Sequence, residues 1–323
     1  MNMTKAKIAA GTIYERSSRH YNFIISSQFT GKRLDQCLAS LLPEVTRSGM
    51  QKLIKDGFVL VNQKSAKPAS LVKANDSISV EIPCPKKCEI AAEDIPLNIV
   101  YEDADLIVIN KSPDMVVHPA CGNWSHTLVN ALLFHCKDLS GIGGELKPGI
   151  VHRLDKGTSG IIVAAKNDAS HLFLSKQFKD RKIKKVYMAL VCGLLKNDHG
   201  EIDKPIGRSI KDRKKFSSKT RKGRIALTSW QVVKRFENNL SLVEVELHTG
   251  RTHQIRVHFA EMGYPLLGDE VYGFKKSKFQ IEFKRPALHA AKIGFFHPST
   301  NVWMEFEAPL AKDFADLLNR LEK

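Results

Sequence analysis

Two amphipathic patterns near the beginning of the sequence predict a pair of short helices. In residues 33–42 the apolar side chains recur at i, i+3, i+4, i+7 and i+8, on Leu34, Cys37, Leu38, Leu41 and Leu42. That spacing gathers them on one side of an α-helix, which Pro43 should end. A second helix is expected between Thr46, a residue type that caps helices, and Gly57, a residue type that follows them. Its apolar face is formed by Met50, Leu53 and Ile54.

Short apolar runs complete a small first unit. Residues 58–61 (FVLV) have the composition of a strand, a turn follows at residues 62–64, and residues 77–82 (SISVEI) predict a second strand. The segment PCPKK that comes next has the composition of a linker. We therefore expect a disordered tail, a small module, a linker and a second domain, over residues 1–20, 21–84, 85–92 and 93–323.

The longer remainder of the chain mixes strands with helices. Apolar runs predict strands over residues 106–110, 149–151, 160–165, 186–193 and 243–247. Helical periodicity predicts helices over residues 127–135, 171–178 and 252–263. Thr252 should cap the last of these helices and Gly263 should end it. Because the elements do not follow a regular βαβ alternation, we expect an α+β domain built around a largely antiparallel sheet.

The composition is that of a globular protein with a strongly basic surface. Hydrophobic residues make up 43% of the 323 residues, charged residues 26%, and the formal net charge is +16. No apolar run approaches the roughly 18 residues that cross a bilayer, so a membrane protein is not expected. A surplus of positive charge of this size favours a polyanionic partner, and structured nucleic acid is the commonest one. We expect a cytoplasmic protein, with no membrane partner.

A cysteine-based site and two enzyme classes, metal enzymes and serine hydrolases, can be weighed on spacing alone. The six cysteines form no C-x-x-C pair and lack zinc-finger partners, so reduced structural thiols are expected. His248, His253 and His258 recur every five residues, which turns them off a common helix face and argues against a metal site. The segment around Ser159 is one residue short of the G-x-S-x-G elbow of serine hydrolases. We therefore expect no metal and no cofactor.

The first unit resembles the S-four RNA-binding module, originally described in a small-subunit ribosomal protein. The matching segments are Arg33-Leu34-Asp35, Thr46-Arg47-Ser48 and Gly57-x-Val59-x-Val61-Asn62. The resemblance implies binding to structured RNA, for which Arg33, Arg47 and Lys52 are the candidate residues. A merely solvated basic face remains the alternative.

Asp155 lies in a polar stretch, residues 152–159 (HRLDKGTS), between two apolar runs. A carboxylate held between buried strands is costly unless it is paired or used. An aspartate in a turn is, however, usually a turn former or a helix cap. Composition alone therefore leaves both a structural and a catalytic role open for Asp155.

A series of longer motifs favours the catalytic role. The matching segments are residues 117–119 (VHP) with 122–123, 152–160 (HRLDKGTSG), 185–193 (KVYMALVCG), 249–258 (TGRTHQIRVH), 263–273 and 285–290 (RPALHA). In this order they resemble the RluA family of pseudouridine synthases across nearly all of residues 95–310. Ala120 and Cys121 depart from the more usual form of the first motif. With the amino-terminal module, the resemblance extends to the family members that act on the large ribosomal subunit.

The resemblance implies a role for four residues. Asp155 would be the catalytic carboxylate, Tyr187 would stack on the flipped uracil, and Arg251 would pair with Asp155. Arg153 would fill the space that the flipped nucleotide leaves. Ordinary strand packing, a phosphate contact and a surface ion pair are the structural alternatives for Tyr187, Arg251 and Arg153 respectively. Whether Asp155 acts as a nucleophile or as a base stays open.

The segment 208–224 is the most basic stretch of the chain, with nine basic residues against one acidic residue. A mobile solvated loop is the ordinary interpretation, but in an RNA enzyme Arg213, Lys214 and Lys215 would clamp phosphates. We therefore expect a monomeric pseudouridine synthase that acts on ribosomal RNA of the large subunit. The alternatives are a synthase for transfer RNA and a catalytically silent RNA-binding assembly factor.

Overall fold

The structure is a computed structural model of the 323-residue chain. It describes residues 19–322 except 44, 46, 83–89, 120–122, 137, 138, 140–147, 211, 213, 214, 221 and 275–280. The expected cap Thr46, the predicted linker and the glycine-rich loop before Gly149 therefore lie wholly or largely outside the described residues. The chain divides into two compact units, residues 1–87 and 88–323.

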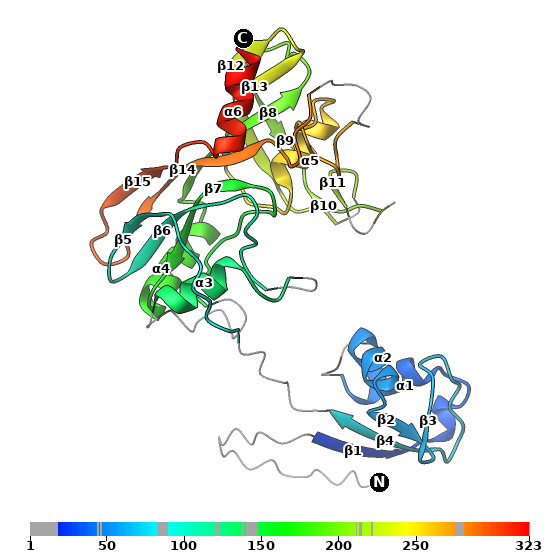
Figure 1. Ribbon diagram of the computed structural model, residues 1–323. Helices are drawn as coiled ribbons and strands as arrows, with labels where there is room; N and C mark the ends of the chain where they lie inside the picture. The colour runs from blue at the N-terminus through cyan, green and yellow to red at the C-terminus, as the bar shows by residue number, and fades with distance from the viewer. Residues whose placement is uncertain are drawn as a thin grey trace. The chain divides into compact units, whose positions relative to one another are not determined.

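The first unit packs two helices against a four-stranded antiparallel sheet (Figure 1). The helices are α1 (Leu34–Leu41) and α2 (Arg47–Lys55), and the strands in sheet order are β1 (Arg19–Ile24), β4 (Ser77–Ile82), β2 (Val59–Val61) and β3 (Lys64–Ser65). The apolar faces of both helices and the inward side chains of β2 and β4 form one buried cluster. The predicted helices and the strand over residues 77–82 are confirmed. Strand β1 was not predicted, and it begins within the segment assigned to the tail.

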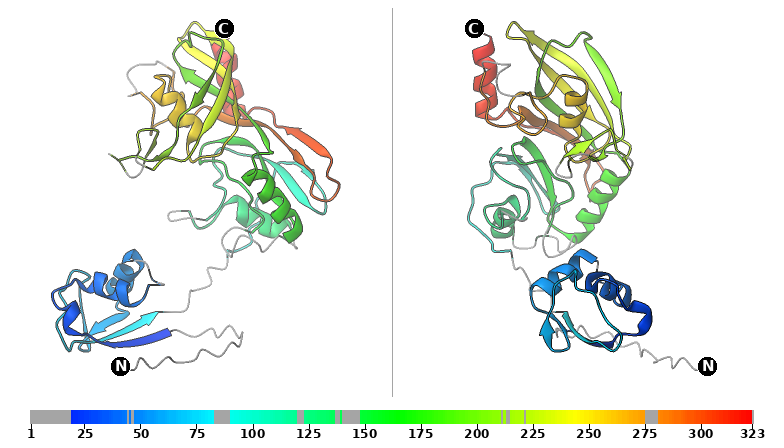
Figure 2. Two further views of the ribbon diagram at one scale, coloured as in Figure 1. Left: turned by 180° about the vertical axis from the view of Figure 1, so that it is seen from behind. Right: turned by 90° about the vertical axis from the view of Figure 1, so that its right-hand side faces the viewer.

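The second unit is built on a nine-stranded sheet. Its order is β5 (Ile99–Glu102), β6 (Leu106–Lys111), β7 (Ser159–Ala165), β14 (Leu288–Phe296), β8 (Lys184–Cys192), β13 (Leu240–Leu247), β12 (Leu227–Phe236) and β9 (His199–Asp203), with β15 (Trp303–Glu307) also paired to β14. Figure 2 shows these strands running through the unit as one twisted sheet. Only the β7–β14 pair among the described strands is parallel. The predicted α+β fold with a largely antiparallel sheet is confirmed.

Helices cover both faces of this sheet. They are α3 (Leu128–His135), α4 (Asp168–Lys179), α5 (Gln254–Glu261) and α6 (Lys312–Leu321). Leu128 of α3 and Phe259 of α5 share a buried cluster with Tyr187 of β8. Leu174 of α4 and Phe314 of α6 belong to clusters on the other face, because successive strand residues point to opposite sides. Among the described residues, no helix is both long and apolar enough to cross a membrane.

Two local predictions were wrong. Residues 149–151 do not form a strand; Ile150 makes an isolated bridge to Ala164, since the chain bends away into the turn that follows. Helix α5 is not capped by Thr252. Its N-cap is His253, which has left-handed backbone angles and makes no capping hydrogen bond through its side chain. Gly263 follows the helix with a φ of +90°, as its prediction as the terminating residue requires.

Candidate active site

The turn that carries Asp155 is fixed to the sheet by close backbone packing. The Thr158 amide donates a hydrogen bond of 3.0 Å to the Asp155 carbonyl, which closes the turn. Two residues later, Gly160 lies against Ala290 in the parallel β7–β14 pair, with a φ of +107°. A Cβ on Gly160 would lie 2.2 Å from the Ala290 carbonyl oxygen. Only glycine permits this approach, which sets where β7 begins and therefore where the turn stands.

Side chains from distant segments hold the same turn. The Ser159 hydroxyl lies 2.9 Å from Nδ1 of His289 on β14. Arg285 donates from Nη1 to the Gly157 carbonyl at 2.8 Å and is itself paired with Asp313 at the start of α6. The turn is therefore held by residues about 130 positions later in the sequence.

His152 anchors the beginning of the turn. Its Nε2 accepts a hydrogen bond of 3.0 Å from the Val163 amide, and its ring stacks on Phe178 with centroids 4.6 Å apart. Burial lowers the pKa of His152 to about 3, so the ring is neutral. This histidine is structural, since both its ring face and its acceptor nitrogen are occupied.

All four predicted site residues meet at one cleft. The cleft has a volume of about 480 Å³, and Arg153, Asp155, Tyr187 and Arg251 all line it. Its walls come from the turn that carries Asp155, the end of α4, strand β8 and the segment 247–256. Residues nearly 100 positions apart in the sequence thus converge on one hollow of a size suited to a nucleoside.

An arginine and a histidine approach the Asp155 carboxylate, and neither was predicted from the sequence to be its partner. Nη1 of Arg256 lies 3.7 Å from Oδ2 of Asp155, and Nε2 of His253 lies 3.8 Å from the same oxygen. The predicted pairing of Asp155 with Arg251 is wrong. Arg251 instead donates from Nε to the Ile225 carbonyl at 3.1 Å, because it lies in the turn before α5 and extends toward the β12 end of the cleft.

Arg256 is held rigidly by a buried partner. Its Nε and Nη2 donate to the two carboxylate oxygens of Asp269 at 2.7 and 2.9 Å, which leaves Nη1 directed at Asp155. The Asp269 side chain is fully buried and also accepts the amides of Val271 and Tyr272. Burial is the largest influence on Asp269 and opposes its ionisation, but the hydrogen bonds and charge of Arg256 together with the two backbone amides outweigh it and place the pKa below its ordinary value. A fixed cation therefore faces Asp155.

Tyr187 lies on β8 beside this carboxylate. Its register pairs it with Ala290 of β14 and Val245 of β13, so the ring belongs to the α3 and α5 face of the sheet. Burial, and after it the negative charge of Asp155, raise the pKa of Tyr187 well above its ordinary value. The ring is thus a neutral, largely buried surface at the bottom of the cleft.

Lys111 is a buried cation close to the turn. It ends β6 opposite Gly160, is 1% exposed, and donates from Nζ to the carbonyls of Ser112 and Met115 at 2.7 and 2.8 Å. Burial lowers its pKa to about 7, assisted by the charge of Arg285. No pattern in the sequence predicts that Lys111 is buried, since a lysine that follows an apolar strand usually faces solvent.

The residues predicted to bind RNA in the first unit surround a buried carboxylate. Arg33 and Arg47 both donate to Asp35, at 3.0 and 3.2 Å, while their side chains remain 39% and 50% exposed. Asp35 therefore orients two guanidinium groups that keep free donors toward solvent. Lys52 is exposed on α2.

In the basic segment, Lys215 donates from Nζ to the Val271 carbonyl at 2.8 Å. Arg213 and Lys214 lie outside the described residues. The segment is attached beside the cleft through β10 (Gly207–Arg208) and β11 (Phe216–Ser217).

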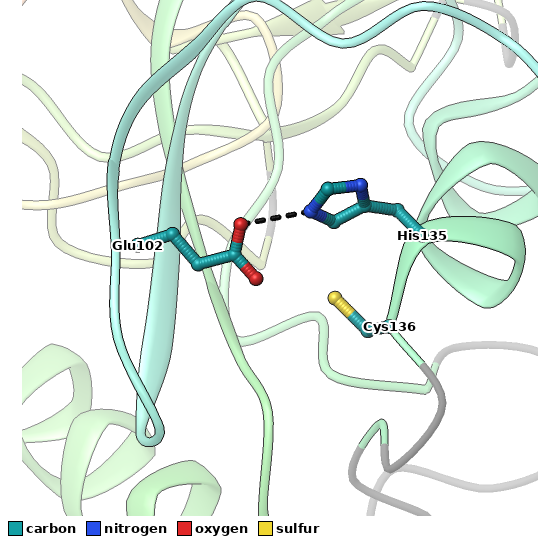
Figure 3. A group of neighbouring side chains, drawn as sticks. All are labelled: Glu102, His135 and Cys136. Carbon is teal, nitrogen blue, oxygen red and sulfur yellow. Dashed lines mark hydrogen bonds and ion pairs between the residues drawn. The ribbon is translucent and has the colours of Figure 1, made fainter.

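Two groups elsewhere combine side chains that could ligate a metal. Glu102, His135 and Cys136 bring their donor atoms within 4.8 Å of one another (Figure 3). Glu102 and His135 already have partners: Nε2 of His135 lies 2.8 Å from one Glu102 oxygen, and Nζ of Lys166 lies 2.7 Å from the other. Asp103, Asp105 and His297 are likewise joined by their own hydrogen bonds to neighbouring side chains. Both groups are explained as hydrogen-bonded networks.

Comparison with known proteins agrees with this geometry. The sequence profile described as RNA pseudouridylate synthase matches residues 105–261, and the S4 domain profile matches residues 32–78. The uncharacterized RNA pseudouridine synthase YlyB of Bacillus subtilis is 46% identical over 298 residues, covering 92% of this chain and 97% of that protein.

Two further relatives carry a more specific name. Ribosomal large subunit pseudouridine synthase D of Zymomonas mobilis is 43% identical over 306 residues, covering 92% of this chain and 96% of its own. The enzyme of that name from Pseudomonas aeruginosa is 40% identical over 306 residues, covering 91% of this chain and 93% of its own. Among solved structures, human RNA pseudouridylate synthase domain containing 1 is similar with a TM-score of 0.55 and 25% identity, covering 72% of this chain and 96% of that chain.

Proposed function

The chain belongs to the RNA pseudouridine synthase family, and from this premise we propose that it modifies uridines of large-subunit ribosomal RNA with Asp155 as its catalytic carboxylate. The family membership makes the protein an isomerase that converts uridine to pseudouridine in RNA. The ribosomal target is supported by the two relatives named for the large subunit and by the S4 domain. Such a target also implies a cytoplasmic location.

The observation that carries the catalytic assignment is the placement of Asp155. Its carboxylate is 20% exposed at the cleft, near a fixed arginine and a histidine and beside a buried tyrosine ring. A rigidly held cation at this distance helps to orient the carboxylate. An aspartate that only forms a turn needs no such neighbours, so the arrangement favours a catalytic role for Asp155 over a structural one.

The reaction determines what the remaining residues must do. The bond between uracil N1 and ribose C1′ breaks, the base turns, and a new bond joins C5 to C1′, while the C5 proton is released and N1 takes up a proton. Nothing is oxidised or reduced. Asp155 can serve either by attacking as a nucleophile or by accepting a proton, and both roles require its ionised form.

The target nucleotide has to leave its stack before the cleft can hold it. In our proposal the uracil ring then lies over Tyr187, and exposed Arg153 occupies the space left in the RNA. Arg251, at the rim of the cleft, contacts the RNA backbone. The guanidinium pair on Asp35 and the basic segment around Lys215 supply further phosphate contacts.

The test is a single-turnover assay with large-subunit ribosomal RNA transcribed from uridine that carries tritium at C5. Asp155→Asn should abolish tritium release and leave RNA binding within about twofold, because many cations carry affinity and one carboxylate carries chemistry. Asp198→Asn, which changes a 78%-exposed aspartate outside the cleft, is the matched control and should behave as the wild type. Tritium release by Asp155→Asn would disprove the catalytic assignment.

The RNA target is tested separately. Pseudouridines are mapped in total RNA from cells with and without this protein. Loss of sites in large-subunit ribosomal RNA supports the proposal. Loss confined to transfer RNA would redirect it to that substrate, and unchanged maps together with intact RNA binding would indicate a silent assembly factor.

A further inference from the structure

His253 has a backbone conformation that calls for a functional explanation. It is the N-cap of α5, with φ of 57° and ψ of 25°, in the left-handed region that residues with a side chain rarely occupy. Its side chain makes no capping hydrogen bond, so helix capping does not account for this strain. Strained residues of this kind cluster at active sites, and here the strain aims the imidazole into the cleft beside Asp155.

The two ring nitrogens of His253 have different partners. Nδ1 lies 2.9 Å from the hydroxyl of Tyr272, whereas Nε2 lies 3.8 Å from Oδ2 of Asp155. In the described part of the chain, the Tyr272 hydroxyl has one other hydrogen-bond partner, the Phe216 amide, which donates to it at 2.9 Å. That oxygen accepts a hydrogen bond from the amide, and the hydroxyl can donate its own hydrogen to Nδ1. A neutral imidazole that accepts at Nδ1 carries its proton on Nε2, on the side of Asp155.

We propose that His253 is a positioning residue of the pseudouridine synthase site: its neutral ring, locked by Tyr272 in the tautomer protonated on Nε2, directs an N–H at the Asp155 carboxylate. The distance of 3.8 Å exceeds a hydrogen bond, and such contacts shorten when substrate closes a site. Arg256 supplies charge to the same oxygen, while His253 supplies a directional donor that fixes the rotation of the carboxylate. The proposal rests on the proposed role of Asp155.

The charges around His253 agree with a neutral ring. Asp155 and Arg153 face it from the catalytic turn, Arg256 from α5, and Asp269 and Tyr272 from the segment that follows α5. Burial is the largest influence and lowers the pKa of His253, and the nearby cations and anions oppose one another. A protonated ring would carry N–H on both nitrogens and could not accept the Tyr272 proton.

The Phe216 amide, which hydrogen-bonds to the Tyr272 hydroxyl, belongs to the basic segment. Phe216 belongs to β11, and its ring meets the His253 ring edge-on with centroids 5.6 Å apart. The guanidinium of Arg208 on β10 lies over the Phe216 ring, 4.7 Å from its centroid. Ser217 and Ser218 of the same segment hydrogen-bond to Glu261 at the end of α5. The hydrogen-bonded series from the Phe216 amide through Tyr272 to His253 therefore connects a proposed RNA contact with the carboxylate.

The first test reads the tautomer directly and needs no RNA. Histidine labelled with ¹⁵N in the full chain reports which nitrogen bears the proton, and His253→Gln assigns its signals by their loss. We expect Nε2–H in the wild type and a shift toward the other tautomer in Tyr272→Phe, which removes only the hydroxyl. A wild-type ring protonated on Nδ1, or an unchanged tautomer in Tyr272→Phe, would overturn the proposal whatever the enzyme's substrate.

The second test measures tritium release and binding with the same ribosomal RNA transcript. Tyr272→Phe should lower the single-turnover rate by roughly tenfold or more, the usual effect of removing a group that orients a catalytic residue, and change the RNA dissociation constant by less than twofold. Tyr264→Phe, a tyrosine on the segment after α5 that does not line the cleft, is the control and should retain the wild-type rate.

A pair of His253 variants distinguishes positioning from packing. The amide of His253→Gln can place an N–H near the position of Nε2, whereas His253→Leu cannot. Retention of a larger rate by His253→Gln supports the proposal, and equal rates in the two variants, each with wild-type melting, would contradict it. A wild-type enzyme that releases no tritium would refute the proposed function, while the tautomer measurement would still decide the hydrogen-bond arrangement.

Discussion

Replacing Gly160 by alanine should separate two strands that hold the turn carrying Asp155. Gly160 has a φ of +107°, and a Cβ there would lie 2.2 Å from the carbonyl oxygen and 2.7 Å from the nitrogen of Ala290. Both contacts are with the backbone of β14, which is buried in the sheet and cannot swing aside as a long side chain can. The substitution therefore forces a displacement of β7, β14 or both.

The expected cost has two parts. A side chain in this backbone region costs about 1–3 kcal/mol. Overpacking of a filled interior costs a further amount of roughly 1–3 kcal/mol. Together they lower the free energy of unfolding of the second unit by about 2–6 kcal/mol, a large share of the roughly 5–15 kcal/mol typical of a domain. For a unit of this size the melting temperature should fall by roughly 5–20 °C.

Thermal melting followed by circular dichroism measures this loss. The matched control is Gly250→Ala, a glycine of the same cleft without a positive φ, where an added Cβ would meet no atom within 4 Å. It should melt within about 1–2 °C of the wild type, as exposed substitutions usually do. Equal melting temperatures for the two variants would refute the argument from close packing at Gly160.

Three further outcomes are expected. The folded chain holds the pKa of Lys111 near 7 against an ordinary 10.5, so the unfolded chain binds more protons between these values. The free energy of unfolding should therefore increase as pH rises from about 7 to 10. Urea titrations of Lys111→Met should lack this part of the increase. The same dependence of the free energy of unfolding on pH in both proteins would contradict the prediction. Deletion of residues 1–84 should weaken RNA binding and make its salt dependence shallower, while turnover at saturating RNA falls much less; unchanged affinity and salt slope would exclude an RNA contact by the first unit. Dialysis against EDTA should leave the rate of tritium release unchanged, and a loss restored only by added metal would contradict this.

Local periodicity predicted most of the elements whose pattern is strong. The helix over residues 33–42 and the strand over 77–82 were found because their apolar side chains repeat at the helical or strand period. Strand β1 was missed because it lies along β4 with alternating exposed and half-buried residues and contains no fully buried side chain. Its strand conformation depends on pairing with a neighbour about 60 residues later, which a local pattern cannot reveal.

The sequence predicted which residues line the cleft but not which side chains approach Asp155. Asp155, Tyr187 and Arg251 were predicted as site residues from the motif resemblance, and all three line one cleft. Arg251 was wrongly predicted as the partner of Asp155 because it lies only five residues from Arg256. The two arginines are distinguished by the start of α5 at Gln254, which leaves Arg251 in the preceding turn and places Arg256 in the helix. Asp269 orients Arg256 and Tyr272 orients His253 through hydrogen bonds. The positions of both side chains therefore depend on how the segment after α5 folds back. The only indication in the sequence was an arginine between apolar helix residues.

The long sequence separation between the turn that carries Asp155 and the segments that hold it has a consequence for synthesis. A ribosome delivers residues in order, so Asp155 emerges well before Arg285 and β14, which fix its turn. The described contacts of the first unit's core, in contrast, all lie within residues 19–82, and this unit can fold while the rest is still being made. A nascent chain can therefore present its S4 domain before it has an organised Asp155, and interrupted synthesis would yield fragments able to occupy RNA without modifying it.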